Sequence, residues 1–401
     1  MKQRMATRIS GLVAGLAIAA TALLCQDYAG QALGQEALRP GLGPENVLVV
    51  YNRGSVDSEA MARYYRGLRG LAANRLCPVS VDRYALSIPM EEFRKFRAEI
   101  LGHLAREKLD GDIRCVLLMC DIPQGVHTAN SGRAEYLALD SMLAEIRATK
   151  NPPSQANRYM ARCRMGTKPG PQGFTREMQE ACGGMVLVSR IEAPGLLEMK
   201  AMLDGAQAGE ASARAGKPMA GTFYIDLEPS TPGTDAGKNS AWDAFNRSMQ
   251  ACGEIGKALG RPVVVENSNK RLTQFASGPA AFYVGWYTLD TTINRGQDTW
   301  APGAIAIEIH SSSARLLKQS LKADPYENSY VAFFASHGVA ATYGAFREPY
   351  LQAFPPPGEV LGALRGGLTW AESTWCNLPQ VNWEMEIIGD PLYRPFAGKT
   401  P

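Results

Sequence analysis

Short apolar runs rich in β-branched residues recur along this chain of 401 residues and constrain its fold more than any other feature. The runs at 46–51 and 113–119 lack the polar–apolar alternation of a half-exposed strand, so they predict strands buried on both faces. Helical patterns at 57–71 and 89–108 lie between them. This alternation predicts an α/β protein, an αβα sandwich built on a mainly parallel sheet.

The same pattern restarts after residue 185. Further strands are expected at 185–191, 221–226, 262–266, 280–284, 304–309, 330–336 and 339–344, and further helices at 195–208, 240–259, 311–321 and 360–373. Residues 121–185 are rich in Gly, Pro, Asn and Ser around one helical stretch, 135–147, and predict a loop-rich insertion. We therefore expect two α/β subdomains, 35–215 and 216–401, with the candidate site in the second.

The first 34 residues predict a secretory signal peptide. Lys2, Arg4 and Arg8 precede an uncharged run at 9–24, and small residues follow it. The run is short for a membrane span, which needs about 20 apolar residues; an uncleaved anchor is the alternative. We expect an exported protein, periplasmic or extracellular, with no stable membrane insertion after cleavage.

Cleavage near Gly34 would leave the chain almost neutral. The whole chain has 42 Lys and Arg against 39 Asp and Glu, and the leader removes three basic residues and one acidic residue, which leaves 39 against 38. Such a charge gives no electrostatic reason to bind nucleic acid. The sequence has no phosphate-binding Gly loop and no metal-ligand spacing, so we predict no cofactor and no metal.

Seven cysteines follow the predicted leader, at positions 77, 115, 120, 163, 182, 252 and 376. Export permits disulfides, and Cys163 and Cys182 flank a Gly/Pro-rich stretch that a disulfide would close into a loop. Cys115 and Cys120 fall on opposite faces of one strand and do not easily pair with each other. The favoured alternative for most of the seven is a buried thiol in an apolar environment.

In open parallel sheets, functional sites form beyond the carboxyl ends of the strands. Four predicted strand ends carry polar or aromatic residues: Asp226; Gly285, Trp286 and Tyr287; His310, Ser311 and Ser312; and His337. An imidazole beside a hydroxyl suits acyl transfer, with a carboxylate to orient the base. The alternatives are structural: serines that cap a helix, aromatic residues that pack at a rim, and histidines that bind backbone.

Several blocks together resemble a known family. They are VLVVYN at 47–52, LALDSMLAE at 137–145, LVSRIEAP at 187–194, YID at 224–226, GWY at 285–287, WAPGAIAIEIHSSSA at 300–314, EPYL at 348–351 and GDPLYRPF at 389–396. They resemble a family of exported bacterial proteins with no established activity, which is itself similar to the gingipain-type cysteine peptidases of the caspase-like group. The resemblance implies a caspase-like fold in which strands 280–284 and 304–309 are parallel neighbours that end in one cleft.

Gingipain-type enzymes carry a histidine and a nucleophilic cysteine at those two strand ends. Here Trp286 and Tyr287 stand at the first end and His310 and Ser311 at the second, so the dyad is missing. The resemblance therefore implies a scaffold without thiol catalysis that binds a peptide, glycan or cell-envelope component. The predicted binding residues are Gly285, Trp286, Tyr287, Asp140 and Glu348.

Two catalytic alternatives stay open. In the first, the protein is a hydrolase in which His310 or His337 activates Ser311 or Ser312, with Asp226 or Asp140 as the orienting acid. In the second, Cys376 and His337 form a relocated thiol pair.

Overall fold

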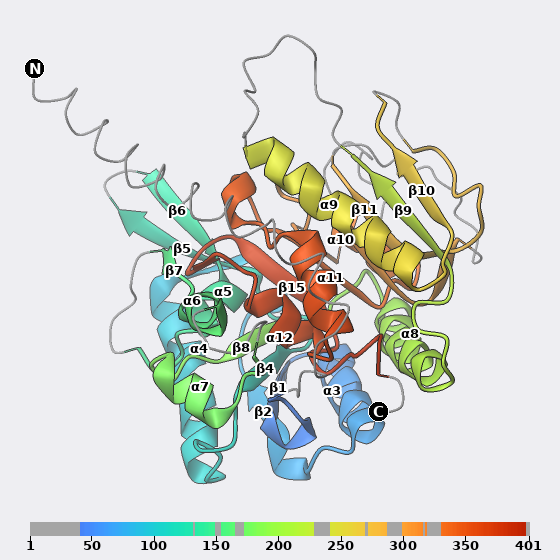
Figure 1. Cartoon of the computed structure of the whole chain (residues 1–401). Helices are drawn as coiled ribbons and strands as arrows, with labels where there is room; N and C mark the ends of the chain where they lie inside the picture. The colour runs from blue at the N-terminus through green and yellow to red at the C-terminus, as the bar shows by residue number, and fades with distance from the viewer. Residues whose placement is uncertain are drawn as a thin grey trace, which may run out of the picture.

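The computed structural model describes residues 41–130, 133–148, 154–164, 172–227, 241–268, 272–286, 299–315, 317–318 and 330–397. The predicted signal peptide and Tyr287 lie outside these residues. Ten strands form one sheet in the order β10-β9-β11-β12-β13-β15-β8-β4-β1-β2, with helices on both faces (Figure 1). The predicted α/β class and the mainly parallel sheet are confirmed.

Strands from the first part of the chain build one end of this sheet. They are β1 (Val47–Asn52), β2 (Leu76–Val79), β4 (Cys115–Leu118) and β8 (Leu187–Arg190). The β1–β2, β1–β4 and β4–β8 pairings are parallel. β4 and β8 are buried throughout, as expected for apolar runs without alternation.

The other end is built from β9 (Thr222–Asp226), β10 (Val263–Glu266), β11 (Ala280–Gly285), β12 (Trp300–Glu308) and β13 (Ala341–Ala345). The β9–β10, β9–β11, β11–β12 and β12–β13 pairings are parallel. The expectation that β11 and β12 are parallel neighbours is thus confirmed. β15 (Met385–Gly389) runs antiparallel to β13 and meets β8 through Ile388 and Arg190, so it joins the two groups.

The main helices are α3 (Val56–Arg69), α4 (Met90–Arg106), α8 (Leu196–Arg214), α9 (Ala241–Ala258), α10 (Tyr330–Ser336), α11 (Pro357–Arg365) and α12 (Trp370–Trp375). α9 contacts α11, which contacts α12, and these three form a layer at the front of Figure 1. On the other face α8 packs against α3 and α10. Tyr224 and Tyr283 pack with Phe333 and Phe334 of α10. The side chains that alternate with these two tyrosines along β9 and β11 point to the other face of the sheet and belong to the cluster that contains residues of α9.

Residues 330–336 form helix α10, so the predicted strand there is wrong. The run is almost wholly apolar, and such a run does not distinguish a buried helix from a buried strand by its periodicity. β12 and β13 are parallel neighbours, and parallel neighbours need a crossover that returns the chain to the starting edge of the sheet. α10 is part of that crossover.

The helix predicted at 311–321 is also wrong for the part the structure describes, where residues 311–315 and 317–318 form turns. Ser312 has a φ of +57°, which a right-handed helix does not accommodate. The single helix predicted at 360–373 is two helices, α11 and α12, separated at Gly366 and Gly367.

The predicted insertion contains more regular structure than expected. β5 (Gly125–Asn130) and β6 (Arg133–Ala138) form an antiparallel hairpin that β3 (Ser87–Pro89) extends. The helical stretch predicted at 135–147 is therefore a strand up to Ala138, followed by α5 (Leu139–Leu143). The remaining elements are β7 (Gln155–Ala156), α6 (Arg158–Arg164), α7 (Arg176–Ala181), β14 (Gln380–Val381) and the 3-10 turns Pro44–Asn46, Ala73–Arg75 and Leu351–Ala353.

None of the helices in the described segments has the length and apolar character needed to cross a bilayer.

Candidate functional site

The carboxyl ends of β9, β11 and β12 lie side by side, which was predicted for β11 and β12 only. Gly285 is the register partner of Glu308, and Val284 that of Ile225, so Asp226, Gly285 and Glu308 form one row across three strands. The side chains of Asp226 and Glu308 are both buried. Tyr283 donates a hydrogen bond to Oε2 of Glu308 over 2.7 Å.

Glycine at position 285 makes room for that hydrogen bond. A Cβ added there would lie 1.8 Å from Oη of Tyr283 and 2.8 Å from Oε2 of Glu308. The phenol crosses above Gly285 to reach the neighbouring strand, and no side chain fits in the same space. Gly285 therefore has a structural role, which is to permit the Tyr283–Glu308 contact. Its binding role stays a prediction.

Trp286 is buried and stacks on Trp242 of α9, with ring centroids 4.1 Å apart. Phe245 of the same helix packs edge-to-face with Trp286, with ring centroids 6.0 Å apart. Trp242 is 45% exposed, whereas most large aromatic side chains in the part of the chain that the structure describes are buried or half-buried. The strand end therefore carries an aromatic pair with one indole exposed to solvent. Sequence reasoning missed Trp242, because the amphipathic pattern of 240–259 does not show which strand end the helix covers.

His310 follows β12 and is buried against Tyr330, with ring centroids 5.0 Å apart. Its Nδ1 lies 2.6 Å from the carbonyl oxygen of Ser311. A carbonyl only accepts, so Nδ1 carries the proton of the neutral ring. Burial lowers the pKa of His310, opposed by the Ser311 carbonyl and by the charge of Glu348, whose side chain is exposed.

His337 does not lie with His310. It follows α10, and its Nδ1 is 2.8 Å from the carbonyl oxygen of Phe333. Ala340 donates its backbone N–H to Ala304, which lies in the first half of β12. His337 therefore sits toward the starting edge of these strands and His310 at their carboxyl edge. The prediction that His337 follows the end of a strand is wrong, because residues 330–336 before it form helix α10.

The serines after His310 connect two strand ends. Ser312 donates its backbone N–H to the carbonyl of Arg347 over 2.6 Å. Ser313 is buried and its Oγ accepts the backbone N–H of Ala345 over 3.1 Å. Ser311 is half-buried. The hydrogen bonds of Ser312 and Ser313 therefore connect the segment after β12 to the end of β13.

Cys376 is buried at the end of α12, with its Sγ 3.5 Å from the carbonyl oxygen of Ser373. All seven cysteines in the described residues are buried and outside any disulfide, so Cys163 and Cys182 are not joined and the alternative of buried thiols is confirmed. Burial raises the pKa of the Cys182 thiol to about 11 and that of Cys77 to about 12. Thiols with such pKa values are poor nucleophiles near neutral pH.

Asp140 belongs to an ion-pair group rather than to the β11–β12 end. Its two carboxylate oxygens accept from Nε and Nη2 of Arg190 over 3.1 Å and 2.5 Å. Arg190 is 0% exposed and also donates to Glu192 over 2.8 Å. Glu386 lies in the same buried surroundings, and burial, with the charge of Asp140, raises its pKa well above the ordinary value.

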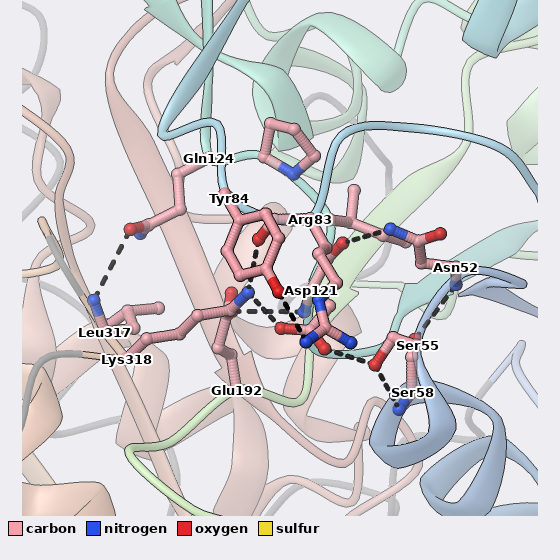
Figure 2. A network of polar contacts seen from close by, with 12 residues as sticks. Asn52, Ser55, Ser58, Arg83, Tyr84, Asp121, Gln124, Glu192, Leu317 and Lys318 are labelled. Carbon is pink, nitrogen blue, oxygen red and sulfur yellow. Dashed lines mark hydrogen bonds and ion pairs between the residues drawn. The ribbon is translucent and has the colours of Figure 1, made fainter.

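A second polar centre, the Asp121 network, lies at the ends of β4 and β8 (Figure 2). Asp121 has a φ of +65°, an unusual conformation for a residue with a side chain. It accepts a hydrogen bond from Ser55, the N-cap of α3, and pairs with Lys318. Lys318 also donates to the carbonyl of Arg83 over 2.9 Å and lies 3.9 Å from Glu192.

Gln124 ties this network to the segment that leaves β12. Its Nε2 donates to the carbonyl of Ala314 over 2.6 Å and to Glu386 over 2.8 Å. Its Oε1 accepts from the backbone N–H of Leu317 (Figure 2). The segments after β4, β8 and β12 therefore meet in one polar network, together with Glu386 of β15. No sequence signal connects Asp121 with Lys318, because they lie far apart in the chain.

Within the segments that the structure describes, no group of three or more His, Cys, Asp or Glu side chains is arranged to hold a metal ion. Comparison with models of protein families, with curated proteins and with solved structures finds no match to this chain.

Proposed function

We propose that this chain is an exported, periplasmic or extracellular binding protein on a caspase-like scaffold. Its ligand would lie at the carboxyl ends of β11 and β12, and the Cys–His dyad of gingipain-type peptidases would be absent. The motif resemblance and the α/β sheet with β11 beside β12 support this proposal. The predicted peptide or cell-envelope partner is part of the same proposal.

The exposed face of Trp242 is the observation that carries the proposal. Aromatic side chains supply large apolar contact area with few rotatable bonds, and they dominate many binding sites. Trp242 is held in place by stacking on buried Trp286, so little conformational entropy is lost when a ligand covers it. The ligand expected from this chemistry presents a flat apolar face, such as a sugar ring or a proline or aromatic side chain in a peptide.

The same geometry gives less support to the catalytic alternatives. Nδ1 of His310 is engaged with a backbone carbonyl, His337 lies toward the other edge, and Cys376 is buried at a helix end. Nucleophile and base need hydrogen-bond contact of about 3 Å.

Intrinsic tryptophan fluorescence with soluble peptidoglycan fragments and proline-rich peptides tests the proposal. We expect saturable quenching in the wild type, loss of binding by about tenfold or more in Trp242→Ala, and partial retention in Trp242→Phe. Leu197→Ala, which truncates another exposed apolar side chain, is the matched control and should bind normally. Equal binding by Trp242→Ala would contradict the proposed site.

Labelling with a fluorophosphonate and with iodoacetamide separates binding from catalysis. Stoichiometric labelling of Ser311, Ser312 or Cys376 in the folded protein would favour a hydrolase instead. N-terminal sequencing of the protein secreted by an expressing bacterium tests the predicted export: a start near residue 35 supports it, and an intact Met1 contradicts it.

A further inference from the structure

The two outer strands of the ten-stranded sheet, β2 and β10, end it in different ways. An outer strand presents a row of backbone N–H and C=O groups to solvent, and proteins usually block such a row against pairing with another chain. β2 is blocked at each outward position. β10 is not blocked by any residue that the structure describes.

The outward positions of β2 are residues 76, 78 and 80, because the carbonyl of Val79 accepts from Arg53 on the β1 side. Leu76 donates its N–H to Ala73. Pro78 has no N–H, and its carbonyl accepts from the guanidinium of Arg53 over 3.1 Å. Ser80 donates its N–H to Glu99 over 3.2 Å. This edge offers no free donor row to a new strand.

On β10 the alternation places residues 262, 264 and 266 toward β9. The carbonyls of Pro262 and Glu266 accept from Phe223 and Leu227 of the neighbouring segment. Val263 and Val265 therefore direct both their N–H and C=O groups outward. Val265 is 50% exposed, and within the described segments no hydrogen-bond partner meets these outward groups.

A second copy of the same strand fits this edge. In an antiparallel pairing about a twofold axis at Val264, Val263 faces Val265 of the partner subunit, and each such pair exchanges both of its hydrogen bonds. Valine is among the residues most favourable in strands, and the three valines in succession contain no proline or charge to interrupt the pairing.

The charges at the ends of β10 favour the same arrangement. Arg261 precedes the strand and Glu266 ends it. About the axis at Val264, Glu266 of one copy lies opposite Pro262 of the other, so like charges do not face each other, whereas in-register parallel pairing would set Glu266 beside Glu266 and Arg261 beside Arg261.

We propose that two copies of this chain associate through antiparallel pairing of their β10 strands, which joins their sheets into one. The interface is short, so the dimer is expected to be weak and to depend on concentration. The pairing uses the outward backbone groups of β10 and neither Trp242 nor His310, so it does not depend on the proposed function.

Sedimentation velocity of the full chain over a range of concentrations tests the proposal. The wild type should shift from monomer to dimer as the concentration rises. Val265→Pro removes an outward N–H that β9 does not use, so it should weaken dimerisation about tenfold or more and leave the fold intact. Val56→Pro, at the first position of α3, replaces another exposed valine where proline is tolerated and should dimerise like the wild type.

Val265→Lys keeps the N–H and adds a like-charge pair at the edge, so it should also give monomers if Val265→Pro fails to fold. A wild type that stays monomeric at every concentration, or a Val265→Lys variant that dimerises as well as the wild type, would overturn the proposal. Binding of a valine-rich peptide by a strictly monomeric wild type would likewise overturn it and indicate a peptide partner.

Discussion

Polar groups at the ends of β4 and β8 are stabilised differently from those at the ends of β11 and β12. At β4 and β8 the polar groups are charged and bound to one another: Arg190 to Asp140 and Glu192, and Lys318 to Asp121. At β11 and β12 the groups are aromatic or hydrogen-bonded, and Trp242 remains 45% exposed. The charged groups at β4 and β8 are bound within the protein and stabilise the fold, whereas the region at β11 and β12 keeps an aromatic side chain accessible to solvent.

The comparison also shows why charge alone is a poor guide to function here. The Arg190 group is charged and buried, yet Arg190, Asp140 and Glu192 each have a partner within the protein. Such groups are costly to break once buried, and they fix one arrangement of the chain. The exposed aromatic stack, which carries no charge, is the better candidate for contact with other molecules.

Arg190→Met should have the largest effect, because it leaves the carboxylates of Asp140 and Glu192 buried without their cation. We expect a loss of about 3–5 kcal/mol in the free energy of unfolding, measured with urea. Arg63→Met removes an exposed pair with Glu59 and should change little. A loss below about 1 kcal/mol for Arg190→Met would mean that this group does not hold the fold together.

Gly285→Ala should have the next largest effect. The added methyl group overlaps Oη of Tyr283, so the Tyr283–Glu308 bond must break or the strand must move, at a cost of about 1–3 kcal/mol. Gly67→Ala is the control: it lies in α3 with no neighbour within 4 Å, and it should be neutral or stabilise by roughly 0.5–1 kcal/mol. Similar unfolding midpoints for both variants would contradict the close contact at Gly285.

Lys318→Met tests the tie between the two regions. Lys318 is 38% exposed, so we expect a loss of only about 1 kcal/mol or less. The sharper measurement is hydrogen–deuterium exchange, which should rise at residues 311–315 in this variant. Lys200→Met removes an exposed pair with Asp204 within one helix and should leave that segment unchanged. Equal exchange in both variants would disprove the tie.

The smallest expected effect is a pH dependence. Burial lowers the pKa of His310 below its ordinary value of 6.5, so between the two values the unfolded chain binds more protons than the folded chain. The stability from neutral His310 is complete above about pH 6.5 and is lost as the pH falls through the folded-state pKa. In that pH range the unfolding free energy of His310→Gln should depend less on pH than that of the wild type. The control Val56→Ala should show the same pH dependence as the wild type. An unchanged slope in His310→Gln would contradict the burial of the imidazole.

The sheet was largely predictable because its strands are apolar runs that differ clearly from the helices around them. The parallel β11–β12 pair, on which the candidate site depends, is confirmed. The errors fall where one-dimensional patterns are ambiguous. Residues 330–336 are apolar throughout, and only the parallel β12–β13 pairing, which needs a crossover, indicates a helix.

The candidate site was only partly predictable. Its strand-end residues Asp226, Gly285 and Trp286 were found because a strand end can be recognised in sequence. Trp242 and Lys318 were missed because their places depend on how a helix and a loop cross the sheet. The position predicted for His337 is wrong because the apolar run before it, residues 330–336, forms a helix instead of a strand.

β15 has a consequence for how the chain acquires its structure. It is the last strand in sequence among the described residues, yet it stands between β13 and β8 in the middle of the sheet. The group of five strands on one side of it and the group of four on the other therefore each have an unpaired inner edge until residues 385–389 are added. A chain that emerges in order from a ribosome can assemble both groups early, but it closes the sheet only when β15 is added.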